Sequence, residues 1–300
     1  SRSFGGGSPI VAITSGFYGD DHNGLYVCHK LIEFFSAIDR GGVSGWTLRG
    51  RIRIFPALNP LGTLTDRRFW PFDRRDINRS FPGNPLGETT ERIAAAVLDG
   101  VGACGVCMDL SSGTRFFNEL PHVRLYESIN VPQGQAESYD LPLIWRRNTT
   151  PLLSGSLAHN LNGRGVPTFV LKFGSANRIN KFFCRWVFAG ILKFLVRFGV
   201  LAGAGAESTF VLPPGMAHLS VGRTAWPEDV VSIVSEDAGL FVADANVGDR
   251  IEYRRPIGRM VDPIGGTLIS EVLAPRAGIL FTIRSNPILY TGTLIARIAS

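Results

Sequence analysis

The sequence predicts an α/β fold followed by a small all-β domain, and two observations lead to this expectation. Up to about residue 210, short apolar runs alternate with stretches of helical periodicity, which is typical of a mostly parallel sheet flanked by helices. Beyond that point helical periodicity disappears, and short strand-like runs are separated by turn signals such as "NVGD" and "DPIGG". We therefore expect an α/β domain over residues 1–210 and a β-barrel or β-sandwich over residues 211–300.

The expected strands of the first domain are four apolar runs bounded by Gly, Pro or Asn. They are "PIVAIT" (9–14), "RIRIFPAL" (51–58), "GVCMDL" (105–110) and "PTFVLKFG" (167–174). Helical periodicity covers 24–38 and 86–100 between them. The expected strands of the second domain are "VVSIV", "GLFVAD", "RIEYRR", "GTLISEVLAP", "GILFTIR" and "TLIARIA".

The most apolar stretch of the chain, residues 182–204, also predicts a helix. Arg185, Lys193 and Arg197 interrupt it at multiples of four residues. This spacing produces the polar stripe of an amphipathic helix, whereas a membrane span needs about 20 predominantly apolar residues. We expect this helix to pack on the sheet and the protein to have no membrane partner.

Composition limits the kinds of ligand and the compartment. The net charge is +6, and only Lys30, Lys172, Lys181 and Lys193 are lysines, so arginine supplies nearly all of the positive charge. The planar guanidinium suits carboxylates and phosphates, which favours an anionic ligand. Scattered arginines without an aromatic stripe argue against nucleic acid. Four cysteines in 300 residues form no disulfide framework, which favours a reducing, cytoplasmic location.

Four segments together resemble a known family. They are "SGFYGDDHNG" (15–24), "ALNPLGTLTDRRFWPFDRRDINRSFPG" (57–83), "CMDLSSG" (107–113) and "GVPTFVLKFG" (165–174). In order and spacing they are similar to the succinylglutamate desuccinylase/aspartoacylase family of zinc amide hydrolases. The C-terminal segment "APRAGILFTIRSNPILYTGTLIARI" resembles the β-domain of that family. The resemblance implies a carboxypeptidase-like fold and an amide-bond deacylase ancestry.

The positions that bind and use zinc in that family carry different residues here. The resemblance places Tyr18, Asp21 and Ser111 at the family's His, Glu and His ligands, and Lys172 at its catalytic Glu. A phenol and a hydroxyl are poor zinc ligands, so we expect no metal and no other cofactor. The loss of the doubly charged zinc ion is balanced by the exchange of the negative catalytic Glu for a positive Lys. The net charge of the site therefore stays at zero. We therefore expect Lys172 to lie within reach of Asp21, because an unpaired buried charge is costly.

The residues that grip the substrate in the family are retained. Arg68, Asn78 and Arg79 match the residues that bind the substrate carboxylate and polarise the scissile carbonyl. A second interpretation is structural: Asp76 and Asn78 fix the "DINR" loop, and Arg79 pairs with them.

Three functions follow. The first is a zinc-free pseudoenzyme that binds a small carboxylate or pairs with an active paralogue. The alternative is an active amide hydrolase on N-acyl amino acids, with zinc in an unorthodox site such as one built from His122, Asp21 and Asp109. The third is an interaction scaffold that works through its β-domain. Self-association is compatible with each of them.

Overall fold

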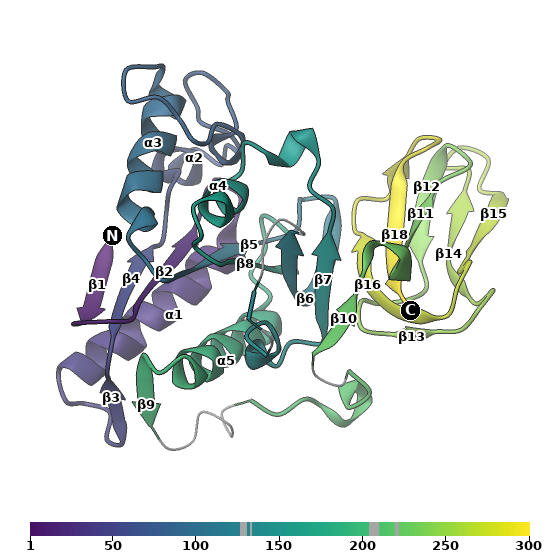
Figure 1. The fold of residues 1–300 in the computed structure, drawn as a ribbon. Helices are drawn as coiled ribbons and strands as arrows, with labels where there is room; N and C mark the ends of the chain where they lie inside the picture. Colours follow the sequence, from purple (N-terminus) through teal and green to yellow (C-terminus); the bar gives the residue numbers. More distant parts are fainter. Residues whose placement is uncertain (127–130, 133, 204–209, 220–221) are drawn as a thin grey trace.

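The computed structural model describes residues 1–126, 131–132, 134–203, 210–219 and 222–300, and it has the expected α/β architecture (Figure 1). The predicted strands of the first part form, and further strands join them. Their bounds are β1 (Arg2–Gly5), β2 (Ile10–Ser15), β4 (Arg51–Phe55), β5 (Val106–Ser111), β6 (Phe117–Tyr126), β7 (Leu143–Arg147) and β8 (Thr168–Gly174). A separate short pair joins β3 (Trp46–Leu48) to β9 (Leu201–Gly203).

The centre of the large sheet is parallel. Strand β2 lies between β4 and β5, and β5 lies between β2 and β8, all with parallel pairing. Antiparallel strands flank this centre: β1 pairs with β4, and β6 pairs with β8. Parallel strands whose carboxyl ends meet at one edge of a sheet are a usual location for binding sites in α/β proteins.

Five α-helices surround the described part of this sheet, and side-chain caps mark the start of several of them. They are α1 (His22–Asp39), α2 (Pro60–Leu64), α3 (Thr89–Gly102), α4 (Leu157–Gly163) and α5 (Lys181–Arg197). Ser156 and Asn180 cap α4 and α5 by accepting hydrogen bonds from backbone N–H groups. Helix α5 is shorter than the predicted 182–204, because Gly199 has φ +77° and β9 follows.

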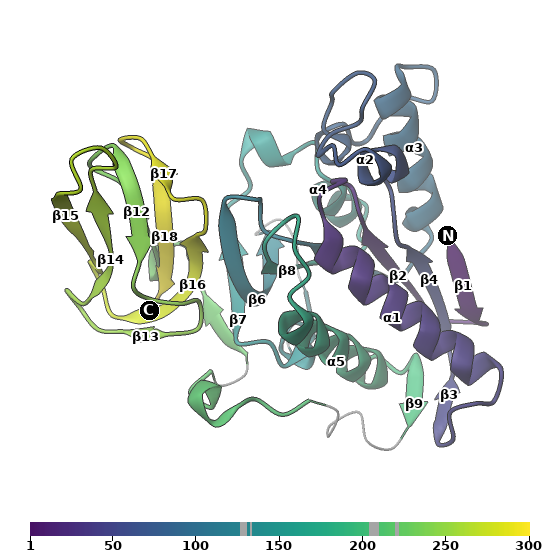
Figure 2. The ribbon, with the colours of Figure 1, turned by 180° about the vertical axis from the view of Figure 1, so that it is seen from behind.

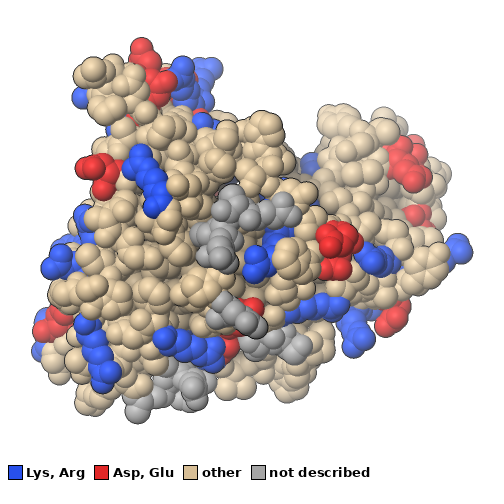
Figure 3. Space-filling model, viewed as in Figure 1, with Lys and Arg blue, Asp and Glu red and all other residues tan. Residues whose placement is uncertain are grey.

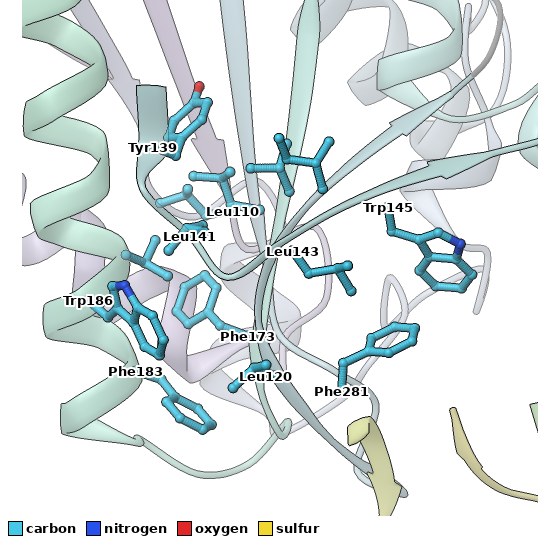
Figure 4. Close-up of a cluster of buried hydrophobic side chains, with 14 of the residues drawn as sticks. Leu110, Leu120, Tyr139, Leu141, Leu143, Trp145, Phe173, Phe183, Trp186 and Phe281 are labelled. Carbon is cyan, nitrogen blue, oxygen red and sulfur yellow. The ribbon is translucent and has the colours of Figure 1, made fainter. Parts of the chain in front are cut away.

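The two faces of the sheet bury different side chains. On one face, Val11, Met108 and Phe173 pack with α1 and α5. On the other face, Ala12 and Cys107 pack with α3 and α4. Figure 2 shows α1 and α5 side by side on their face. Figure 4 shows Phe183 and Trp186 of α5 next to Phe173. Because successive strand residues point to opposite faces, the sequence position of a side chain fixes its face.

The C-terminal part contains strands and no α-helix in residues 210–219 and 222–300. Its strands are β10 (Arg223–Ala225), β11 (Val230–Val234), β12 (Gly239–Ala243), β13 (Arg250–Ile251), β14 (Pro256–Val261), β15 (Leu268–Leu273), β16 (Gly278–Arg284), β17 (Ile288–Leu289) and β18 (Leu294–Ala299). The predicted strand "RIEYRR" shrinks to β13, because Arg254 has φ +61° in a turn.

Strands of the two parts are hydrogen bonded to each other. Strand β16 pairs with β6, and β10 pairs with β7, so the large sheet continues past residue 210. The division at that residue stays a prediction.

Lys and Arg are scattered over the face drawn in Figure 3. Among the described helices, none has the length and apolar character needed to cross a membrane.

Candidate functional site

The site lies at the carboxyl ends of β2, β5 and β8, on the face covered by α3 and α4. Asp109 and Ser111 share this face with Cys107 because they follow it at intervals of two along β5. Lys172 is on the same face of β8, since the side chains before and after it pack on the α5 side. Ser111 and Lys172 are direct partners in the parallel β5–β8 ladder. Strand register therefore brings these two side chains together.

Asp21 holds the turn after β2 to the end of β5. Its carboxylate caps α1 by accepting from the Gly24 N–H at 3.3 Å. It also accepts from the Ser112 N–H at 3.0 Å and from the Ser112 hydroxyl at 2.6 Å. Burial raises the pKa of Asp21, and the hydrogen bonds from Ser112 oppose this shift. The carboxylate is thus committed to structural hydrogen bonds.

Lys172 contacts serines and has no direct contact with Asp21, which makes the expected ion pair wrong. Its Nζ donates to the Ser111 hydroxyl at 2.9 Å and to the Ser112 carbonyl. No Lys172–Asp21 ion pair is found among the described residues; Ser112 lies between the two and hydrogen bonds to both. Burial, followed by the Arg124 charge, lowers the pKa of Lys172 to about 8.

Tyr18 is a buried, neutral phenol with two polar neighbours. Its hydroxyl donates to the Asp76 carboxylate at 3.2 Å. Its ring lies under the Arg68 guanidinium, whose central carbon is 3.8 Å from the ring centre. Burial and the Asp76 charge raise the pKa of Tyr18 far above its usual value. The hydroxyl is therefore protonated in this structure and engaged with Asp76.

This donor set does not fit the zinc ion of the resembled family. Asp21 binds the Ser112 amide, Tyr18 donates to a carboxylate, and Ser111 accepts from an ammonium. A catalytic zinc site needs three ligands drawn from imidazole, thiolate and carboxylate. Across the described residues, no three His, Cys, Asp or Glu side chains are close enough to share an ion.

The unorthodox site suggested from His122, Asp21 and Asp109 is accordingly not assembled. His122 is fully buried in β6, where Nδ1 lies 2.8 Å from the Leu120 carbonyl and Nε2 lies 3.4 Å from an Arg124 guanidinium nitrogen. Nδ1 therefore carries the proton and donates, while Nε2 accepts. Burial lowers the pKa of His122 to about 3, so the imidazole is neutral.

A cavity of about 80 Å³ opens where these groups meet. Its lining mixes basic, hydroxyl and small apolar side chains: Tyr18, Asn78, Arg79, Asp109, Ser111, Arg124, Tyr126, Arg147, Leu153, Ser156, Ala158, Val170 and Lys172. Four of these residues are basic, and one, Asp109, is acidic. Burial raises the pKa of Asp109 to about 7, so the cavity is positive at neutral pH and favours an anion.

Of the three predicted gripping residues, the structure brings Asn78 and Arg79 to this cavity. Both also have structural roles. Asp76 accepts from the Asn78 N–H at 2.9 Å, and the Asn78 side-chain oxygen accepts from the Leu157 N–H, also at 2.9 Å. Arg79 donates to the Asn78 carbonyl at 2.8 Å. Asn78 and Arg79 therefore line the cavity, as the substrate-binding interpretation predicts, and also hold the "DINR" loop, as the structural interpretation predicts.

Arg68 lies apart from the other two. Its Nη1 pairs with the buried Asp20 carboxylate at 3.1 Å. The guanidinium lines a wider pocket of about 740 Å³, together with Arg67, Phe69 and Arg115. Tyr18 lines the small cavity, and its ring contacts Arg68, which lines the wider pocket. Tyr18 therefore lies between the small cavity and the wider pocket.

The sequence analysis missed Arg124 and Arg147, which complete the positive side of the cavity. They come from β6 and β7, and their guanidinium carbons lie 4.7 and 4.6 Å from the Trp145 ring centre. Glu119 is 3.8 Å from Arg124. Burial lowers the pKa of Arg147 to about 10. The available signal was the arginine within the apolar run "ELPHVRLY" and the two arginines that end the apolar run "LIWRR".

Comparisons with known proteins show which proteins the chain is similar to. Residues 8–133 match the succinylglutamate desuccinylase/aspartoacylase catalytic domain. An N-alpha-acetyl-L-2,4-diaminobutyric acid deacetylase from Halomonas elongata is 26% identical over 306 residues, covering 98% of this chain and 83% of that protein.

Solved structures show the same fold over nearly the whole chain. A succinylglutamate desuccinylase/aspartoacylase from Rhodobacter sphaeroides has a TM-score of 0.78 at 20% identity, covering 98% of this chain and 86% of that one. The product-bound ectoine utilization protein EutE (DoeB) from Ruegeria pomeroyi has a TM-score of 0.78 at 22% identity with the same coverage. Residues 8–133 are thus similar to the succinylglutamate desuccinylase/aspartoacylase catalytic domain, and nearly the whole chain shares the fold of these solved structures.

Proposed function

We propose that the chain is an amide hydrolase for N-acyl amino acids and that it works without its family's zinc site. The observation that carries this proposal is the small cavity in which Arg79, Arg124, Arg147 and Lys172 face one acidic residue, Asp109. Guanidinium groups bind a carboxylate through paired hydrogen bonds, and the free carboxylate of an N-acyl amino acid supplies that anion.

The comparisons support the class of reaction. The family is named for enzymes that cleave acyl groups from amino acids, and the Halomonas relative is named as a deacetylase of an acetylated diamino acid. An amide whose amine part is an amino acid is thus the ligand that agrees with both the family and the charge of the cavity.

A second candidate is a pseudoenzyme that binds the same ligand and leaves it intact. The residues at all four family positions favour it, because Tyr18, Asp21, Ser111 and Lys172 supply no set of zinc ligands. Both candidates require carboxylate binding and differ only in whether the amide is cleaved.

The test measures binding and cleavage on the same protein, in the presence of a chelator. A panel of N-acetyl amino acids is compared with the corresponding methyl esters, which lack the carboxylate. Raised melting temperature with release of free amine supports the hydrolase, and raised melting temperature without amine supports the pseudoenzyme. No response to any free acid contradicts both.

Arg79→Met should weaken binding about tenfold or more, because a charge-assisted hydrogen bond is removed. The matched control is Arg92→Met, since Arg92 is exposed on α3 and outside the cavity lining. Equal binding by the two variants would show that the ligand does not use Arg79.

A further inference from the structure

The pairing of Ser111 with Lys172 is specific to this chain's departures from its family and has a chemical meaning of its own. The two residues are ladder partners at the ends of β5 and β8, and the Lys172 Nζ is 2.9 Å from the Ser111 Oγ. Both side chains line the same cavity of about 80 Å³. A hydroxyl in contact with an amine, facing a ligand cavity, is the arrangement of a nucleophile and its base.

The pair is held in place by a network of buried groups. Lys172 also donates to the Ser112 carbonyl. The Ser112 hydroxyl donates to Asp21 at 2.6 Å and accepts from the Asn23 amide at 3.0 Å. Ser112 is therefore fixed from two sides, and it fixes the ammonium. Pre-organised positioning of this kind is what a nucleophilic site requires.

Lys172 is able to take a proton near neutral pH. Burial and the neighbouring Arg124 charge lower its pKa to about 8, so a substantial fraction of the amine is neutral in weakly alkaline solution. In the protonated form it donates to Ser111, as in the structure, and in the neutral form the hydrogen bond reverses and Ser111 donates to it.

Donors for a developing oxyanion line the same cavity. The Arg79 and Arg124 guanidinium groups lie on the lining together with Ser111 and Lys172, and the Asn78 side chain, also on the lining, hydrogen bonds to Asp109. Donors that face developing negative charge in a water-poor site stabilise a tetrahedral intermediate.

We propose that Ser111 is the nucleophile and Lys172 the general base of a zinc-independent amide cleavage, an inference that rests on the proposed function. The Ser111 Oγ forms a bond to the acyl carbon and its proton passes to the Lys172 Nζ. The C–N bond breaks as Lys172 returns that proton to the amine, which leaves an acyl ester on Ser111. Water then attacks the ester, Lys172 takes its proton and passes it to the Ser111 oxygen, and the products are an amine and a carboxylic acid.

The test traps the acyl ester with 4-nitrophenyl acetate in the presence of a chelator. We expect the protein to gain an acetyl group on the Ser111 peptide by mass spectrometry and to lose it in neutral hydroxylamine, which cleaves esters and leaves acetyl-lysine intact. Ser111→Ala should abolish this adduct, and Ser232→Ala, at an exposed position of β11, should keep it.

Lys172→Met should slow formation of the adduct by roughly 100-fold or more, the contribution of a general base. Should that variant fail to fold, Lys172→Arg retains the charge and cannot accept the proton, so it is expected to show the same loss. Lys30→Met, exposed on α1, is the matched control. An adduct on Lys172, no adduct on Ser111, or an unchanged rate in both Lys172 variants would overturn the proposal.

The outcome is separable from that of the proposed function. Amine release from N-acetyl amino acids that persists in Ser111→Ala would leave the hydrolase standing and remove the Ser111 mechanism. Acetylation of Ser111 in a protein that neither binds nor cleaves N-acetyl amino acids would support Ser111 as a nucleophile and contradict the proposed function.

Discussion

Arg68 donates through Nη1 to both carboxylate oxygens of Asp20, at 3.1 and 3.4 Å, and this pair ties the turn after β2 to the loop after α2. The Asp20 side chain is only 1% exposed, whereas that of Arg68 is 25% exposed. The same guanidinium covers the Tyr18 ring. Arg68 therefore makes structural contacts, although the family resemblance implies that it binds substrate.

Arg68→Met should destabilise the protein by about 3 kcal/mol, because it leaves the buried Asp20 carboxylate without its cation. Asp20→Asn combined with Arg68→Met should recover much of this loss, since no unpaired charge remains. Urea unfolding of the two single variants and the double variant measures the coupling. Additive losses would show that the pair contributes nothing as a pair.

Rates that depend on Lys172 should increase with pH. The neutral amine is the form that accepts a proton, and the pKa of Lys172 is about 8, so acylation of Ser111 should rise through pH 8 and level off above it. The measurement is the initial rate of Ser111 acetylation at constant ionic strength from pH 6 to pH 10, with each pH value checked for folding by circular dichroism. A rate that falls across this interval would contradict the role of a base.

The fold was predictable from the sequence where the signal is local. The runs 9–14 and 105–110 become β2 and β5, and the helical period at 24–38 becomes α1, because burial on one or two faces leaves a pattern in neighbouring residues. The pairing of β6 with both β8 and β16 was not predictable, because it joins segments far apart in the chain and has no local pattern.

The candidate site divides in the same way. The resemblance located Tyr18, Asp21, Ser111 and Lys172, since they follow recognisable strands. It did not place Lys172 on Ser111 and Ser112 in preference to Asp21, because that choice depends on the β5–β8 register. Arg124 was missed for the same reason: it reaches the cavity from β6, whose position in the sheet is a long-range property.

Restoring the family's residues at four positions should make stability depend on zinc. The variant combines Tyr18→His, Asp21→Glu, Ser111→His and Lys172→Glu, and zinc that binds only the folded form adds about 2.7 kcal/mol at 100 times its dissociation constant. Thermal melting with zinc and with chelator measures the effect. The parent protein, and a triple variant that keeps Ser111, serve as controls and should respond less. An equal response from the parent would mean that its own residues bind zinc.

Asp109→Asn should stabilise the protein at alkaline pH and have little effect at acid pH. Burial raises the pKa of Asp109 from 3.8 to about 7 in the folded chain, so the folded form binds a proton that the unfolded form has already released. Stability from this group is present below pH 4 and is lost as pH rises to about 7. Asparagine is neutral throughout and keeps an oxygen that accepts from Thr14, the donor that lies 3.1 Å from Asp109.

The expected gain is a few degrees in melting temperature at pH 8, which falls to nothing near pH 4. Asp99→Asn, at an exposed position of α3, is the matched control and should show no such dependence on pH. If Asp109→Asn lowers the melting temperature equally at both pH values, the carboxylate is ionised in the folded protein and its charge is compensated by Lys172 and the arginines of the cavity. The cavity would then be less positive than the raised pKa of Asp109 implies, and it would favour an anionic ligand less strongly.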